Sequence, residues 1–147
     1  MSSHSRIAAA VLATSAGAFL CTGAAAQSAS PSLYERLGGR DALGAVVGEL
    51  WTVVAADARI NRHFAHTRPD AFAGQLVDFL CQASGGPCRY KGQDMHSAHT
   101  GMQLTDGDFN ALAEDTALVL DRFKVPAREK GEVMNMLGGL RPAVLGH

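Results

Sequence analysis

Apolar residues that recur with the period of an α-helix are the feature that most limits the folds open to this chain. The clearest run predicts a helix over residues 41–56, because its apolar positions follow the spacing i, i+3, i+4, i+7, i+8 and i+11. These positions are Leu43, Val46, Val47, Leu50, Trp51 and Val54. After residue 31, no stretch alternates apolar and polar residues as a half-buried strand would. The pattern therefore predicts an all-α protein.

Three more long helices and two short ones follow from similar signals. One long helix is predicted to start at Pro69 and to end before the Gly-Gly-Pro at 85–87. Another starts after Thr105, which pairs with Asp108 like a capping box, and the last ends at Pro142. Short helices are expected over 32–37 and, for two or three turns, from 95. The predicted buried residues of the long helices are Phe72, Leu76, Phe79, Leu80, Ala83, Phe109, Leu112, Thr116, Val119, Leu120, Phe123, Val133, Met136, Leu137 and Leu140.

The first 26 residues predict a secretory signal peptide. Arg6 supplies a positive start, residues 7–20 are apolar, and the three alanines at 24–26 resemble a cleavage site. An uncleaved anchor is the alternative, but the apolar run is short for a membrane span. Leu20 before Cys21 argues against lipid attachment. We expect cleavage before Gln27, a disordered leader over 27–31, one domain over 32–147, and a periplasmic or secreted protein.

Charge and cysteine content limit the partners. Without Arg6 the chain has 12 Lys and Arg against 14 Asp and Glu, and the charges are interspersed. Nucleic acid is therefore not an expected partner, and no membrane span is expected after processing. Two cysteines remain, Cys81 and Cys88. In an exported chain they form either a disulfide or two half-buried free thiols, and both readings stay open.

Histidine is the residue type with the most chemical information. Two H-x-x-H pairs occur, His63 with His66 and His96 with His99. Together they could hold zinc or copper in a haem-free helical module. The first pair lies in a polar segment between Arg62 and Arg68, where surface histidines are the simpler interpretation.

His99 has apolar companions instead. Met95, His99 and Met102 follow i, i+4 and i+7, so they share a face of the predicted helix. Such an imidazole is either a core histidine or a ligand. A haem needs an axial imidazole, an apolar slot and a polar rim, and the polar residues 89–91 are candidates for that rim.

Several short motifs in a fixed order resemble those of one family. They are SLYERLGG at 32–39, DARINRHF at 57–64, GGP at 85–87, YKGQDMHSAH at 90–99, LTDGDF at 104–109 and VP at 125–126. Each is weak alone, but the combination spans nearly all of Ser32 to Leu145. In this combination the chain resembles a group I truncated haemoglobin.

The resemblance implies a truncated globin fold, a two-on-two helical sandwich around haem b. It implies that His99 is the proximal iron ligand, that Phe64 packs on the haem plane, and that Tyr90 lies near a propionate. The residues expected to contact the cofactor are Phe64, Phe72, Leu76, Tyr90, Met95, His99, Leu104, Phe109, Val133 and Leu137.

The distal side departs from the family pattern. Gap-free matching puts Trp51 where the family commonly has tyrosine, and Phe72 and Leu76 at two usually polar positions. Gln75 is the only amide nearby. A hydrogen bond to the ligand is worth roughly 1–3 kcal/mol. We therefore expect O₂ to be held less tightly than in relatives with Tyr and Gln, unless the Trp51 N–H points at the iron.

The expected function is reversible binding of a diatomic ligand, O₂ and also NO or CO, by an oxygen-binding protein rather than a dedicated enzyme. NO dioxygenation or a peroxidase-type reaction, with an unidentified reductase, is the first alternative, although no distal acid or base is evident from the sequence. Redox sensing through Cys81 and Cys88 is the second. The haem-free metal module is the third.

Overall fold

The computed structural model describes residues 30–146, so the predicted signal peptide over 1–26 and most of the 27–31 leader lie outside the described residues. The described part is all-α, and none of its helices is long and apolar enough to cross a membrane. Its elements are α1 (Leu33–Arg36), α2 (Gly39–Ala56), the 3₁₀ helix η1 (Asn61–Phe64), α3 (Pro69–Ala83), α4 (Met95–His99), α5 (Asp106–Arg122), α6 (Ala127–Gly139) and α7 (Arg141–Val144).

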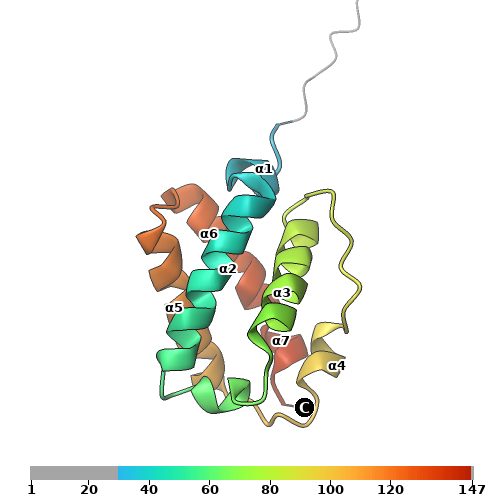
Figure 1. Ribbon diagram of the computed structural model, residues 1–147, viewed down its shortest axis with the longest axis vertical. Coiled ribbons are helices and arrows are strands. Elements are labelled where there is room, and N and C mark those ends of the chain that lie inside the picture. The colour runs from blue at the N-terminus through green and yellow to red at the C-terminus, as the bar shows by residue number, and fades with distance from the viewer. Residues whose placement is uncertain (1–29, 147) are drawn as a thin grey trace, which may run out of the picture.

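The long helices form two pairs. Helix α2 packs against both α3 and α5, and α5 packs against α6, while α4 lies beside α7 at the lower end of the molecule (Figure 1). This arrangement confirms the predicted all-α, two-on-two fold. One buried cluster joins α2 to α5 and consists of Leu50, Val54, Ile60, Ala111 and Val119. A second joins α2 to α3 and consists of Leu43, Val47, Val77 and Cys81.

Helix starts are where the sequence signals predicted them. Pro69 is the first residue of α3. At α5, the Thr105 hydroxyl accepts a hydrogen bond from the Asp108 N–H at 3.2 Å, and the Asp108 carboxylate accepts one from the Thr105 N–H at 2.9 Å. This reciprocal capping box satisfies two backbone donors that the helix itself leaves unpaired. A second capping box, Ser32 with Glu35, starts α1.

Four predictions about helix ends and faces are wrong. Ala83, predicted on the buried face of α3, is exposed, because it lies in the last turn of that helix. The helix from residue 95 ends at His99, because Gly101 and Gln103 have positive φ angles of 82° and 51° that do not continue a helix. Phe123 is 43% exposed instead of buried, since it follows the last turn of α5 as its C-cap. Pro142 does not close the last helix. It lies in the first turn of α7, where its missing N–H costs nothing.

The turn after α3 is crowded. Tyr34 in α1 donates its backbone N–H to the Ser84 carbonyl at 2.9 Å. A Cβ on Gly86 would lie 2.7 Å from Cys81 Sγ and 2.7 Å from the Tyr34 ring. The glycines at 44 and 48 in α2 differ, because a Cβ there would have no such neighbour within 4 Å. The glycine at position 86 is therefore a packing requirement, and those in α2 are not.

Candidate functional site

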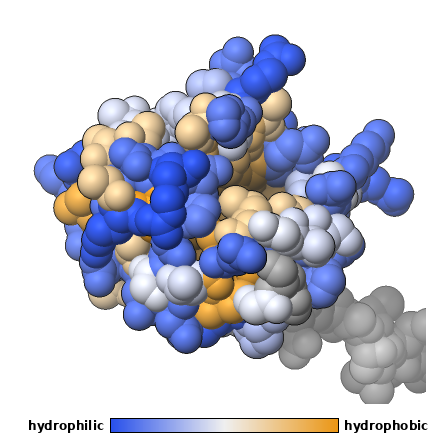
Figure 2. All heavy atoms as spheres, turned by 90° about the horizontal axis from the view of Figure 1, so that it is seen from below, coloured by the Kyte–Doolittle hydropathy of each residue, from blue (hydrophilic) through white to orange (hydrophobic). Residues whose placement is uncertain are grey.

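A cavity of about 510 Å³ lies between the two helix pairs. Its wall comes from α2, α3, α5 and α6, with further residues from η1, α4 and α7. The wall is apolar apart from His63, Thr67, Gln75, Ser84, Tyr90, His99 and Thr116. On the face seen from below, apolar side chains are visible between hydrophilic ones (Figure 2). The size and lining suit a large apolar ligand held by few polar groups.

His99 is in the wall of this cavity, at the end of α4. Its Nδ1 lies 2.6 Å from the Met95 carbonyl oxygen. A carbonyl only accepts, so Nδ1 carries the hydrogen and Nε2 keeps the lone pair that a metal needs. Asp94 fixes the start of α4, because its carboxylate accepts a hydrogen bond from the Ser97 N–H at 2.9 Å. The short helix thus presents one imidazole with a defined tautomer.

Three aromatic rings form one corner of the site on the side of α2 and α3. The Trp51 and Phe72 ring centroids are 5.3 Å apart, those of Trp51 and Phe64 are 6.0 Å apart, and those of Phe64 and Phe72 are 5.6 Å apart. Phe64 and Phe72 line the cavity, but Trp51 does not. The indole therefore packs beside the two phenylalanines that face the cavity.

Gln75 lies at the edge of the cavity, toward the loop that precedes α4. Its side chain is exposed, and a Cβ added to Gly92 would lie 2.5 Å from Gln75 Oε1 and 2.3 Å from Tyr90 Oη. Tyr90 donates its hydroxyl to the Gln93 carbonyl at 2.8 Å and packs edge-on against Phe79. The amide predicted as a distal donor thus lies against this loop.

Most of the predicted site residues come together. Ten line the cavity, namely Phe64, Phe72, Gln75, Leu76, Tyr90, Met95, His99, Phe109, Val133 and Leu137. Leu104 and Trp51 do not line it. Leu104 lies in the irregular segment between α4 and α5. The helix predicted from residue 95 was longer than α4, so this segment was not expected. Met102 lines the cavity although it has left the helix.

His63 is not the surface histidine that its polar neighbours suggested. Its side chain is only 14% exposed, it lines the cavity, and its Nε2 is 3.2 Å from Asp108 Oδ1. Arg62 donates to the same oxygen at 2.6 Å. Hydrogen bonds from Thr105, followed by the groups of His63 and Arg62, hold the pKa of Asp108 far below its ordinary range. In the sequence, the adjacent apolar Phe64 was the local indication that His63 is buried. The carboxylate that it contacts, that of Asp108, is 45 residues away. His66 is exposed, as predicted.

A disulfide joins Cys81 in α3 to Cys88 in the following loop. Cys81 is fully buried, and Arg40 donates to Cys88 Sγ at 3.3 Å. Of the two open readings for this pair, the structure has the bridged one. The bond holds the start of the loop that carries Tyr90 toward α4.

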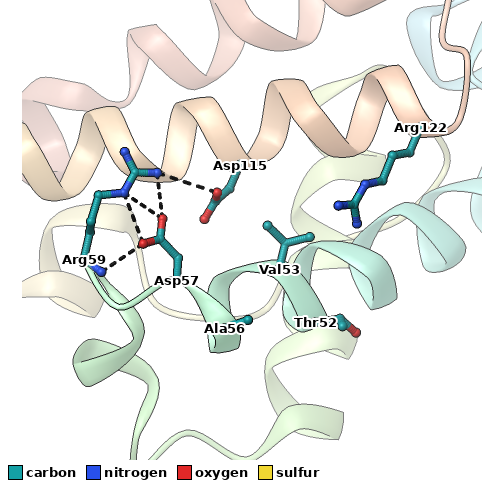
Figure 3. A pocket seen from close by; sticks show the side chains of 7 residues that line it. All are labelled: Thr52, Val53, Ala56, Asp57, Arg59, Asp115 and Arg122. Carbon is teal, nitrogen blue, oxygen red and sulfur yellow. Dashed lines mark hydrogen bonds and ion pairs between the residues drawn. The ribbon is translucent and has the colours of Figure 1, made fainter.

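A second, open pocket of about 370 Å³ lies where α2 ends beside α5 (Figure 3). Arg59 donates to Asp57 at 2.7 Å and to Glu114 at 2.6 Å, and lies 3.9 Å from Asp115. Hydrogen bonds from Arg59 lower the pKa of Asp57, whereas burial raises the pKa of Asp115. Asp57, Arg59 and Asp115 line the pocket together with Thr52, Val53, Ala56 and Arg122. The ion pairs of Arg59 connect the end of α2 to α5.

The main cavity fits the predicted cofactor on chemical grounds. It combines an apolar slot with one imidazole whose Nε2 is available, and polar groups gather at Tyr90 and Gln75. No group of three or more His, Cys, Asp or Glu side chains that could hold a metal ion occurs within residues 30–146. A haem-free metal module therefore has no ligand cluster there.

Comparison with known proteins agrees with this geometry. The model of the bacterial-like globin family matches residues 32–145. A group 1 truncated haemoglobin of Tetrahymena thermophila is 36% identical over 116 residues, which cover 79% of this chain and 96% of that protein. One of Mycolicibacterium paratuberculosis is 32% identical over 113 residues, 77% of this chain and 83% of that protein. The ferric truncated haemoglobin of Tetrahymena pyriformis matches with a TM-score of 0.77 and 35% identity, covering 80% of this chain and 100% of that one.

Proposed function

This chain belongs to the bacterial-like globins and, within them, to the group 1 truncated haemoglobins, and from that premise we propose that it binds haem b through His99 and reversibly holds a diatomic ligand. Haem-based ligand binding is the activity of the family. The finer assignments concern the ligating residue, the form of haem and the character of the distal side.

The observation that carries the proposal is the environment of His99. Its Nδ1 donates to the Met95 carbonyl at 2.6 Å, so Nε2 is the nitrogen available to iron within a cavity of about 510 Å³. Phe64 and Phe109 would contact the macrocycle, and Tyr90 would lie toward its propionates. A bound haem would supply the iron that binds O₂, NO or CO. The chain would supply the His99 nitrogen that holds it and a mostly apolar wall.

The distal side supports weak retention of O₂. Phe64, Phe72 and Leu76 line the cavity there and carry no hydrogen-bond donor. Gln75 and His63 also line it, but Gln75 is exposed at its edge and His63 Nε2 faces Asp108. Trp51 packs against the two phenylalanines, and Gln75 lies against Gly92. Without a donor, O₂ loses roughly 1–3 kcal/mol of stabilisation relative to a pocket that has one. NO and CO depend less on a donor, so the pocket would still admit them.

Absorption spectra of the ferric, ferrous and CO forms test the assignment. We expect a Soret band in the wild type after reconstitution with haemin. His99→Gly should abolish it, and added imidazole should restore it by occupying the vacated position. His66→Gln is the matched control, because His66 is exposed and outside the cavity. A Soret band of full intensity in His99→Gly without imidazole would refute the ligand assignment.

NO dioxygenation remains a second candidate activity and would need a reductase that this chain does not supply. A redox-sensing role would rest on the Cys81–Cys88 disulfide. The absence of a metal cluster within residues 30–146 argues against the haem-free module.

We also propose that the chain is exported and cleaved before Gln27. The basis is the leader sequence together with a disulfide, since such bonds persist in oxidising compartments. Detection of the mature N-terminus by mass spectrometry tests this.

A further inference from the structure

The cavity wall contains a second imidazole, which the proposed function does not use. His63 lines the same cavity as His99, with 14% of its side chain exposed. Imidazole is the side chain that changes charge between pH 5 and 8. Of the described residues that line the cavity, only these two carry it. Once His99 is assigned to iron, His63 is the remaining imidazole among the described residues that line the cavity.

The surroundings of His63 favour one of its two nitrogens for proton exchange. Its Nε2 is buried and lies 3.2 Å from Asp108 Oδ1, without a hydrogen-bond partner within residues 30–146. Asp108 is 7% exposed and stays ionised, because two groups of Thr105 donate to its Oδ2 at 2.9 and 2.7 Å. A carboxylate only accepts, so its charge at this distance favours the hydrogen on Nε2 in neutral His63 and leaves Nδ1 as the nitrogen with the free lone pair.

The charges around His63 are few. Arg62, on the same 3₁₀ helix, donates to Asp108 Oδ1 at 2.6 Å, so the carboxylate has a guanidinium on one side and the imidazole on the other. Residues that α2, α3, α6 and α7 contribute to the cavity wall carry no charged side chain, and α4 contributes only His99 as a titratable one. An added proton on His63 is therefore stabilised mainly by Asp108.

We propose that the His63–Asp108 pair is the proton-exchanging site of the cavity, which accepts a proton from a ligand that must lose one in order to bind. The inference rests on the haem binding proposed above. With hydrogen cyanide, the H–C bond breaks, its electron pair stays on carbon as cyanide, and the proton moves to Nδ1 of His63. The resulting imidazolium faces the Asp108 carboxylate through Nε2. Dissociation returns the proton along the same path.

The His63–Asp108 pair bears on the peroxidase-type alternative. A peroxidase-type reaction was disfavoured because no acid or base was evident near the ligand. Hydrogen peroxide belongs to the same class as hydrogen cyanide, since it also gives up a proton when it binds as an anion. The pair thus provides the acid–base group that such chemistry requires.

Ligand association rates in the haem-loaded protein test the pair. Stopped-flow mixing compares hydrogen cyanide binding to the ferric form with CO binding to the ferrous form, between pH 5 and 8. CO carries no proton and serves as the internal reference. In His63→Gln we expect cyanide association to slow by at least about tenfold. CO association should stay within about twofold, and the exposed His66→Gln control should match the wild type in both.

A second variant keeps the imidazole and removes its counter-charge. In Asp108→Asn cyanide association should slow, because the carboxylate that faces the ring after it accepts the proton is gone. Identical cyanide profiles in wild type, His63→Gln and Asp108→Asn would overturn the proposal while CO binding leaves the proposed function intact. Absence of both a Soret band and CO binding would instead overturn the proposed function and, with it, this inference.

Discussion

The two sides of the cavity are built in different ways. One side comes from α2 and α3, which have 18 and 15 residues and are joined by the buried Leu43, Val47, Val77 and Cys81. The side that carries His99 comes from α4, which has five residues, none of them buried, and is flanked by irregular segments. The first side is held by packing. The second is held by a disulfide, by hydrogen bonds of Tyr90 and Asp94, and by contact with α7.

The two sides of the cavity therefore differ in what holds them in place, which is packing on one side and links at the helix ends on the other. Packed long helices keep their form because every displacement exposes apolar surface. A five-residue helix has little intrinsic stability, so its position depends on the links at its ends. The position of the His99 imidazole should therefore respond to changes in those links, whereas the wall from α2 and α3 should respond to changes in side-chain chemistry.

Removal of the disulfide should have the largest effect on stability. The bridge spans a sequence separation of 7, and a loop of this size stabilises by about 2–3 kcal/mol in the chain-entropy description. We expect Cys81→Ala/Cys88→Ser to lower the free energy of unfolding in urea by about that amount. Haem transfer to a scavenger should become faster, and wild type in reductant should behave alike. Lower stability with unchanged haem transfer would show that the loop does not hold the proximal side.

A polar group on the distal wall should have the next largest effect. In Leu76→Gln an amide replaces an apolar side chain that lines the cavity. A new hydrogen bond worth about 1.4 kcal/mol would slow O₂ dissociation about tenfold. Stopped-flow measurement checks this, and CO dissociation from the same variant is the control because it depends less on a donor. Equal slowing of both ligands would indicate a steric effect instead.

Acid should weaken the contact between η1 and the start of α5. Asp108 joins η1, through Arg62 and His63, to the start of α5. Its pKa is lowered on folding, so its contribution is complete above the unfolded value of about 3.9 and is lost as the pH falls below that value. In Asp108→Asn we expect about 1–2 kcal/mol less stability at pH 7 and a smaller loss between pH 6 and 3. Urea midpoints across this range measure it, with the exposed Asp121→Asn as control.

Trp51→Phe should have the smallest effect. The indole packs against Phe64 and Phe72 and does not line the cavity, so it is not positioned as a donor to the ligand. We expect O₂ dissociation to change by no more than about twofold. A dissociation rate that rises more than about fivefold in the variant would show that the Trp51 N–H reaches the ligand after all.

The sequence predicted the long helices and most of the cavity wall, because apolar periodicity and capping residues are local signals. It misjudged α4, although Gly101 was a visible stop signal, since the spacing of Met95, His99 and Met102 suggested a longer helix. It missed the burial of His63, because the partner Asp108 is distant in the sequence and Arg62 beside it indicated solvent. Gap-free matching assigned Trp51 a position in the chain but not the orientation of its indole, which depends on the volumes of Phe64 and Phe72.

Glycine is used in two opposite senses in this molecule. At position 86 even a methyl group would collide with the disulfide sulfur and the Tyr34 ring, both of which are fixed in place, so this site has no room for sequence variation. At Gly44 and Gly48 the space beside the helix is open, and alanine there would stabilise the chain by about 0.4–1 kcal/mol each. Substitution of these two glycines in α2, neither of which lines the cavity, is therefore expected to raise the thermal stability of the chain.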